Sequence, residues 1–395
     1  MEIRKTTTVR FYDYAGTFIG IYKDATVGSF RKIINGGLGD LTIDLAMTFA
    51  QAYESQYTVL FNRVEVVVTD AETPPGGVII YSGFVFERYP TMDGSEQKVV
   101  LTCRGHAARF AYLPLKASTT TVVVTDTTNG LNVTNPTAAT LNKVLSHIIA
   151  LYRQESVHPI INTTATSVET TTRTWTYRLK TKTIQYAIEK LMENAPAGAY
   201  WRVGADNIFY YRQRSTTPDH ILTLGAHITA IQDRQTLDGL VNRFHFSYNG
   251  APPGQAKVYQ DTPSSSIYGD WWAFKVDGRY SVQGEVDNVG TSAIAARKTP
   301  PRRTIITVAD NNGDRNIGYD IERFEPGDTL SILNLPLAAQ QNFPAMFQIV
   351  AVQYSLGQAV LELDTPDDDL AREFAKAERE EQGDDTENVP NTYTI

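Results

Sequence analysis

The chain has 395 residues, enough for about two to four domains, and its 42% hydrophobic and 20% charged residues are ordinary for a folded protein. The formal net charge is −8. The stretch from Asp364 onward holds eleven acidic and three basic residues, and the rest of the chain holds 33 of each. A neutral body without a basic stripe argues against a tight nucleic-acid binder.

The composition favours β structure and a soluble chain. There are 21 Tyr and 16 Phe, and Thr is often next to Val, residues that suit pleated surfaces. The N-terminus lacks the apolar core of a secretion signal, and no apolar stretch approaches the roughly 18–20 residues that span a bilayer. The single cysteine, Cys103, excludes an internal disulfide and fits no metal-ligand spacing; its strand-like surroundings predict a packed thiol.

The first 110 residues or so read as strands and turns. Strands are predicted at 62–70, 78–87 and 97–103, separated by a Pro/Gly loop at 74–77 and a turn at 92–94. Strands at such short spacing predict an antiparallel barrel or sandwich.

Gly36, Gly37 and Gly39 form a glycine-rich run that invites comparison with a phosphate-binding loop. No strand-then-helix context supports that function. We interpret the run as a bend between strands that uses the freedom of glycine at positive φ.

The middle of the chain changes to α+β character. Asn135-Pro136 predicts a helix start, and one apolar helical face recurs over the residues Leu141, Val144, Leu145, Ile148, Ile149 and Tyr152. A second helix is predicted at 182–194, followed by a hairpin of 200–203 with 208–211.

The β character then returns. Strands are predicted within 221–231 and 240–248, an irregular segment at 260–269 and a short Ala-rich helix at 292–298. The last strands are expected at 304–308, 329–334, 347–354 and 360–364. We therefore predict a mostly β protein with two similar antiparallel β-barrel domains, an inserted α+β domain and a charged C-terminal tail. The predicted domains are a first barrel at 1–112, an inserted domain at 113–213 and 253–303, a second barrel at 214–252 and 304–364, and an acidic helical or disordered tail at 365–395.

The two β regions share a repeated pattern of strands and loops. Strand, Pro-containing loop, strand, turn and strand follow one another from Val64 to Cys103, and the same pattern recurs from Leu330 to Leu363. The similarity is one of pattern and leaves a true duplication open.

The residues that enzymes need do not form a recognisable site. None of the six histidines stands at metal-ligand spacing, and His245 alternates with Phe244 and Phe246 as a histidine on a sheet face would. No nucleophile elbow or Walker loop occurs, and the clustered acids lie in the tail. The run 311–315 is interpreted as a hairpin turn. We predict no catalytic, cofactor-binding or metal site, no cofactor, and no enzymatic activity.

Two sets of residues remain as candidate binding sites. Trp271 and Trp272 are expected either to anchor a core or subunit contact or to form a platform on which sugars stack. Leu370 and Phe374 are the apolar residues of a charged helix that needs a partner, and they predict a docking site for another protein.

Several short motifs, in their order along the chain, resemble phage tail-tip or baseplate hub proteins. The matching segments span about residues 1–364: Tyr81–Val85, Val99–His106, Ile221–Gly225, Leu240–Arg243, Tyr268-Gly269 and Glu325–Asp328. The turn after Met92, the Trp pair and the acidic tail depart from the pattern.

The resemblance implies a fold, an assembly and a function. It implies two similar β-barrels per chain and a homotrimer, so that six similar units place a threefold tip beneath a sixfold tail tube. The expected protein is a virion component at the tail tip, assembled in the host cytoplasm. Its expected partners are tail-tube, tape-measure and spike or fibre proteins, with DNA crossing its lumen without specific binding. The alternative is a carbohydrate-binding adhesin or receptor-binding tail protein. Host, receptor, tail type and channel-lining residues are not encoded in any motif.

Overall fold

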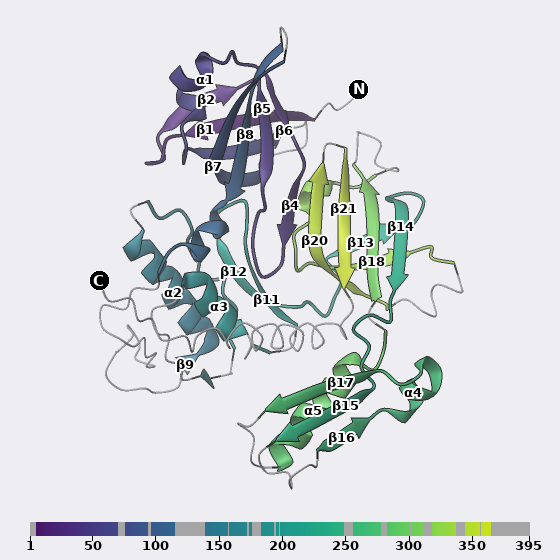
Figure 1. Ribbon diagram of the computed structural model, residues 1–395. Helices are drawn as coiled ribbons and strands as arrows, with labels where there is room; N and C mark the ends of the chain where they lie inside the picture. The colour runs from purple at the N-terminus through teal and green to yellow at the C-terminus, as the bar shows by residue number, and fades with distance from the viewer. Residues whose placement is uncertain are drawn as a thin grey trace. The chain divides into compact units, whose positions relative to one another are not determined.

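The computed structural model divides the chain into two compact units (Figure 1), Met1–Ile231 with Ile305–Leu363 as unit 1 and Gln232–Thr304 with Asp364–Ile395 as unit 2. The residues that it describes are 5–69, 76–93, 96–114, 139–156, 158–171, 174–175, 183–192, 195–196, 198–248, 256–277, 283–300, 302–310, 318–336, 344–355 and 357–364.

The first β sheet of unit 1 has seven strands in the order β2-β1-β6-β7-β8-β5-β3. They are β1 Thr6–Tyr12, β2 Phe18–Tyr22, β3 Ala25–Val27, β5 Leu41–Leu45, β6 Arg63–Thr69, β7 Val78–Asp93 and β8 Glu96–Gly105. Each pair of neighbouring strands in this sheet is antiparallel. Short helices α1 (Gln51–Glu54) and η1 (Gln56–Thr58) connect β5 to β6, and Ala52 is buried in the core.

The second sheet has the order β13-β19-β20-β21-β18-β14. Its strands are β13 His220–Thr223, β14 Ile228–Gln235, β18 Arg302–Ala309, β19 Thr329–Leu333, β20 Phe347–Ser355 and β21 Gln358–Asp364, with η3 (Ile321–Arg323) before β19. When the edge strand β2 is left out and the remaining strands of each sheet are ranked by their position in the sequence, the two sheets have the same spatial order of ranks. One difference is that β13 pairs with β19 in parallel, whereas β1 and β6 are antiparallel.

One strand connects the two sheets directly. β4 (Phe30–Ile33) lies between β3 and β5 in the sequence but pairs antiparallel with β20 of the second sheet (Figure 1). The two sheets also share one apolar core, in which Phe30 contacts Tyr81 of the first sheet and Tyr354 of the second. Burial of this continuous apolar surface is the main force that joins the two sheets.

An α+β segment of unit 1 follows the first sheet. It comprises η2 His106–Ala111, β9 Ala139–Thr140, α2 Leu141–Glu155, β10 Thr174–Trp175, α3 Ile184–Met192, β11 Ala199–Val203 and β12 Phe209–Gln213. The apolar faces of α2 and α3 pack with Phe110, Trp201 and Phe209 in a separate core. The predicted helical face of 141–152, the second helix and the hairpin are confirmed.

Unit 2 is inserted between β14 and β18. Its sheet has the order β16-β15-β17, with β15 Arg243–Tyr248, β16 Lys257–Gln260 and β17 Trp272–Asp277, and its helices are α4 Thr262–Tyr268 and α5 Gln283–Arg297. α5 covers one face of the sheet, where Phe244, Phe246 and Tyr259 pack against Val286 and Ile294.

The structure confirms the mostly β fold and corrects three local predictions. The segment 260–269 is not irregular, because Asp261 caps α4 by accepting a hydrogen bond from Ser264 N–H at 2.9 Å. The helix predicted at 292–298 begins nine residues earlier, at Gln283. Positive φ in the glycine-rich bend occurs at Asn35, not at the glycines.

Several predictions fall outside the described residues. These are the helix start at Asn135-Pro136, the turn at 311–315 and the tail at 365–395. The division into two barrel domains, an inserted domain and a tail likewise stays a prediction.

Candidate functional site

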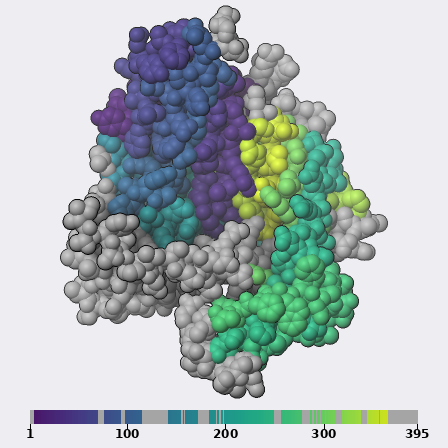
Figure 2. Space-filling model, in the orientation of Figure 1, coloured from purple at the N-terminus to yellow at the C-terminus, as the bar shows by residue number. Residues whose placement is uncertain are grey.

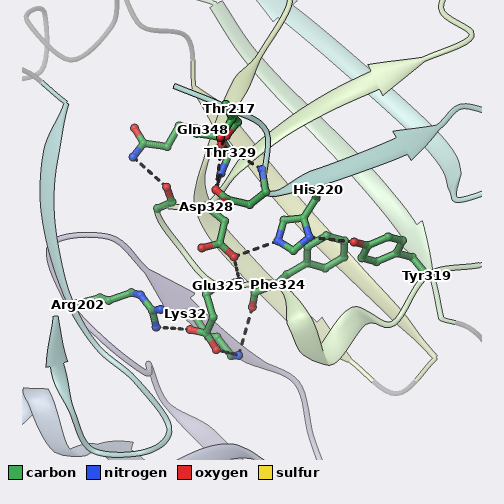
Figure 3. Close-up of polar contacts among 12 residues, drawn as sticks. Lys32, Arg202, Thr217, His220, Tyr319, Phe324, Glu325, Asp328, Thr329 and Gln348 are labelled. Atoms are coloured by element: carbon green, nitrogen blue, oxygen red, sulfur yellow. Dashed lines mark hydrogen bonds and ion pairs between the residues drawn. The ribbon is translucent and has the colours of Figure 1, made fainter. Parts of the chain in front are cut away.

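A buried ionic contact joins three separate segments of unit 1 (Figure 3). Lys32 of β4 is 3% exposed, and its Nζ lies 2.9 Å from Oε1 of Glu325 in the turn before β19. Arg202 of β11 approaches the other carboxylate oxygen, with Nη1 2.6 Å from Oε2. The carboxylate of Glu325 therefore links β4, the α+β segment and the second sheet.

The electrostatics of Glu325 favour its ionised form. Burial alone would raise the pKa of this carboxyl group, but the charges of Lys32 and Arg202 outweigh it and hold the pKa below its ordinary value. Loss of either cation would leave a partly buried carboxylate with less of its charge compensated.

Asp328 extends this contact into the second sheet. Its Oδ2 accepts a hydrogen bond from Glu325 N–H at 3.1 Å and lies 3.0 Å from Nε2 of His220. The other ring nitrogen of His220 lies 3.0 Å from the hydroxyl of Tyr319. Both nitrogens of this buried imidazole thus have a partner, and the group orients side chains rather than presenting a free base.

Gly327 allows the turn to pack closely. Its φ is 100°, and a Cβ there would lie 2.0 Å from the ring of Tyr200 in β11. Gln348 donates to the Gly327 carbonyl at 3.3 Å, and Thr329 donates to Thr217 O at 2.7 Å. We call Lys32, Arg202, His220, Glu325 and Asp328 the polar junction.

A second buried cluster joins the start of β1 to the second sheet. Lys5 Nζ lies 2.6 Å from Asp310 Oδ1 and 2.7 Å from Glu322 Oε2, and Tyr354 donates to Glu322 at 3.2 Å. Burial and the neighbouring Glu322 raise the pKa of Asp320, at the edge of this cluster, to about 6. Both clusters hold segments together, and neither contains an available nucleophile.

His106 is a buried histidine with a different environment. It stacks on Phe84 with ring centroids 6.0 Å apart, and neither ring nitrogen has a hydrogen-bond partner. Burial, with a smaller contribution from Arg63 and Arg109, lowers the pKa of His106 to about 3. The imidazole is therefore neutral in the folded protein.

Unit 2 carries an exposed apolar face on the side of its sheet away from α5. Trp272, Phe274 and Val276 alternate along β17 with exposed fractions of 44, 71 and 83%, and Val258 of β16 is 48% exposed. The rings of Trp272 and Phe274 stack with centroids 6.0 Å apart and planes 14° apart. We call these four residues the aromatic face; they belong to the segment 232–304 of unit 2, which is coloured green in Figure 2. Exposed apolar residues grouped in this way make the face a candidate interaction site.

The candidate residues from the sequence divide between this face and the rest of the chain. Trp272 lies in the aromatic face, whereas Trp271 is 37% exposed and its Nε1 donates to Tyr268 O at 2.8 Å. Leu370 and Phe374 lie outside the described residues. His245 lies in β15 on the same side as the aromatic face, 5.5 Å from the Phe274 ring, so its predicted place on a sheet face is confirmed.

The glycine-rich bend borders a cavity of about 370 Å³, lined also by Arg104, Asp40 and Trp201. The glycines allow close packing: a Cβ on Gly37 would lie 2.8 Å from Ala107. Because Arg104 pairs with Asp40 at 3.3 Å, the cavity lacks the uncompensated positive charge that a phosphate site needs.

Neither a metal cluster nor a spanning helix occurs in the described part of the chain. Over those ranges, no three or more His, Cys, Asp or Glu side chains are grouped to hold a metal. No helix there is long and apolar enough to cross a membrane.

Comparisons with solved structures define the fold. The 43 kDa tail protein of prophage MuSo2 from Shewanella oneidensis matches over 92% of this chain and 99% of its own, with a TM-score of 0.61 and 13% identity. A tail protein from Neisseria meningitidis MC58 matches over 92% and 99%, with a TM-score of 0.57 and 12% identity. Prophage tail protein gp18 from Listeria monocytogenes EGD-e matches over 94% and 98%, with a TM-score of 0.52 and 11% identity.

The chain therefore has the fold of phage tail proteins, as the short motifs suggested. No protein-family model matches its sequence, and no curated protein does.

Proposed function

We propose that the chain is a structural, non-enzymatic subunit of a phage tail tip or baseplate hub. The observation that carries the proposal is that the two sheets of unit 1 share one strand topology. Their orders are β1-β6-β7-β8-β5-β3 and β13-β19-β20-β21-β18-β14. Three copies would supply six such modules, which is what a threefold tip needs beneath a sixfold tube. The fold shared with prophage tail proteins supports this assignment.

The proposed role as a ring subunit depends on a rigid connection between the two sheets of unit 1. The polar junction and the shared core fix the two modules of one chain to each other, so the chain can act as one rigid third of a ring. Such a ring would seat the tape-measure protein, carry spike or fibre proteins, and open a path for DNA.

The charge distribution supports passive passage of DNA. The body before Asp364 is formally neutral, so a lumen formed from it would not retain DNA as a basic channel does. A lumen lined with Lys and Arg would contradict this part of the proposal. The acidic tail, with Leu370 and Phe374, is proposed to dock on a neighbouring tail protein.

A second function, a carbohydrate-binding adhesin, is favoured by the aromatic face. Stacked, exposed rings such as those of Trp272 and Phe274 are suited to packing against the apolar face of a sugar. Glycan-array binding that is lost in Trp272→Ala and kept in Phe18→Ala, a variant of an exposed unit 1 aromatic, would support it.

The test of the proposed function is the position of the chain in the virion. A gold-labelled chain should complement a phage that lacks the gene and place the label at the distal end of the tail. Labels distributed along the tube, or virions that infect normally without the chain, would refute the tail-tip role.

A further inference from the structure

A pair of backbone hydrogen bonds marks the end of the contact between β6 and β7. Val85 N–H of β7 donates to the carbonyl of Asn62 at 2.9 Å, and Phe61 N–H donates to the carbonyl of Val85 at 2.8 Å. Phe61 has a φ of 73°, an uncommon conformation for a bulky residue.

The second sheet has the same pair at the same place. Ile349 N–H of β20 donates to the carbonyl of Asp328 at 2.8 Å, and Gly327 N–H donates to the carbonyl of Ile349 at 2.7 Å. Gly327 also has a positive φ, of 100°. Val85 of the first sheet therefore corresponds to Ile349 of the second.

Both strands shift their alternation directly after this point. In β7 the register of the pairing with β8 shifts between Val85 and Glu87. In β20 the core residues change from Phe347 and Ile349 to Val352 and Tyr354, which is the change that one extra residue produces. The correspondence between β7 and β20 thus continues beyond the shift. Arg88 of β7 is the residue equivalent to Val352 of β20.

Beyond the shift, the edge of β20 is filled by β4. Residues Ala351–Tyr354 pair with Phe30–Ile33, and Ile34 N–H donates to Val350 O at 3.0 Å. By the alternation of an antiparallel ladder, the backbone of Val352 also faces β4.

Over the residues that the structure describes, the corresponding edge of β7 is open. β6 pairs with β7 only between Val78 and Phe84, while β8 occupies the opposite side as far as Asp93. Among the described residues, no strand pairs with the β6 side of positions 86–92, and Tyr89 is 52% exposed. Such an edge is a template for another strand, and Pro90, which has no N–H, limits it to a short one. β4 is itself four residues long.

The chain order indicates the donor. β4 leaves the first sheet between β3 and β5, and unit 2 leaves the second sheet between the corresponding strands β14 and β18. We propose that the open edge of β7 at positions 86–89 binds a strand from unit 2 of a second copy of this chain. The contact between copies would repeat the contact that β4 makes with β20 within one chain. This inference rests on the proposed ring and names one of its contacts.

Photo-crosslinking tests the contact directly. In the full chain, the exposed aromatic residue Tyr89 is replaced by the photoreactive aromatic residue benzoylphenylalanine. The variant is irradiated at a concentration at which the chain forms its oligomer. The expected product has twice the chain mass and joins position 89 to residues 236–301 of another copy. Crosslinks confined to other segments, or no crosslinked dimer from a sample whose mass shows a trimer, would overturn the inference and leave the ring standing.

A matched pair of variants tests the backbone pairing. Arg88→Ala and Arg88→Pro both lose the side-chain contact to Ala52 O, but only the proline variant loses the N–H that corresponds to that of Val352. Arg88→Pro should raise the concentration of half-association by about tenfold or more relative to Arg88→Ala, at equal thermal stability. Equal association of the two variants would contradict the pairing.

Discussion

Phe30 and Tyr354 stack with ring centroids 5.2 Å apart and planes 29° apart, although they lie near opposite ends of the chain. Phe30 is 1% exposed and comes from the crossing strand β4, whereas Tyr354 belongs to the strand that receives it. This aromatic stack and the polar junction both connect the first sheet of unit 1 to the second.

Truncation of this aromatic anchor should destabilise unit 1. Phe30→Ala removes a buried ring that contacts both sheets, and we expect a loss of about 3–5 kcal/mol in the free energy of unfolding by urea. Phe18→Ala, at a 55% exposed position of β2, should cost less than about 1 kcal/mol. Equal losses for the two variants would show that Phe30 does not connect the sheets.

The polar junction should behave as a coupled unit. In a double-mutant cycle of Lys32→Ala and Glu325→Ala, we expect a coupling energy of about 1–3 kcal/mol, because the single variants each leave a buried charge with less compensation. Arg31→Ala and Glu362→Ala form the control cycle, since that pair is 2.8 Å apart but the Arg31 side chain is 46% exposed, against 4% for Lys32. Its coupling should stay below about 1 kcal/mol. Strict additivity at Lys32 and Glu325 would contradict the account.

His106 should make the protein sensitive to acid. Its pKa is about 3 when folded and near 6.5 when unfolded, so between these values the unfolded chain binds the extra proton. The stability from the neutral, buried ring is present above pH 6.5 and is lost as the pH falls, by about 2 kcal/mol at pH 5. His106→Leu should lose less stability than the wild type between pH 7 and pH 5 in urea titrations. Parallel losses would disprove the assignment.

The aromatic face should matter for binding and not for folding. Trp272→Ala should change the free energy of unfolding by no more than about 0.5 kcal/mol, because the ring is 44% exposed, and should weaken either self-association or glycan binding. Phe246→Ala, on the face that α5 covers, should instead cost about 3–5 kcal/mol. A Trp272→Ala variant that assembles and binds as the wild type does would remove the face as a site.

Removal of residues 365–395 tests the proposed docking tail. The truncated chain should form the same oligomer, because all strands and core clusters of the described residues lie at or before Asp364, but it should fail to complete tail tips. Normal tails from the truncated chain, seen in electron micrographs of a complemented lysate, would refute the docking role of Leu370 and Phe374.

Local patterns in the sequence predicted local structure well. The apolar face from Leu141 to Tyr152 predicted α2, and alternation around His245 predicted β15. α4 was missed because its residues are mostly polar, although Asp261 and Pro263 carried a helix-start signal. The glycines of the bend were interpreted by their conformational freedom, whereas close packing against Ala107 is what requires Gly37.

Long-range contacts were beyond the sequence. β4 was not among the strands predicted from the sequence, and no local pattern shows that its partner lies in the second sheet. Glu325–Asp328 was noticed as a motif, but its ion pairs with Lys32 and Arg202 depend on three distant segments meeting. The aromatic face was foreseen in part, through Trp272, while Phe274 and Val276 became visible only with the sheet in place.

The symmetry of the assembled protein tests the central claim most directly. Averaged electron micrographs of the isolated chain, or of tail tips that contain it, should show a ring with threefold symmetry and six similar lobes, of three times the chain mass of 43.9 kDa. A particle without a threefold axis, or a chain that stays monomeric at every concentration and in the tail, would contradict the account.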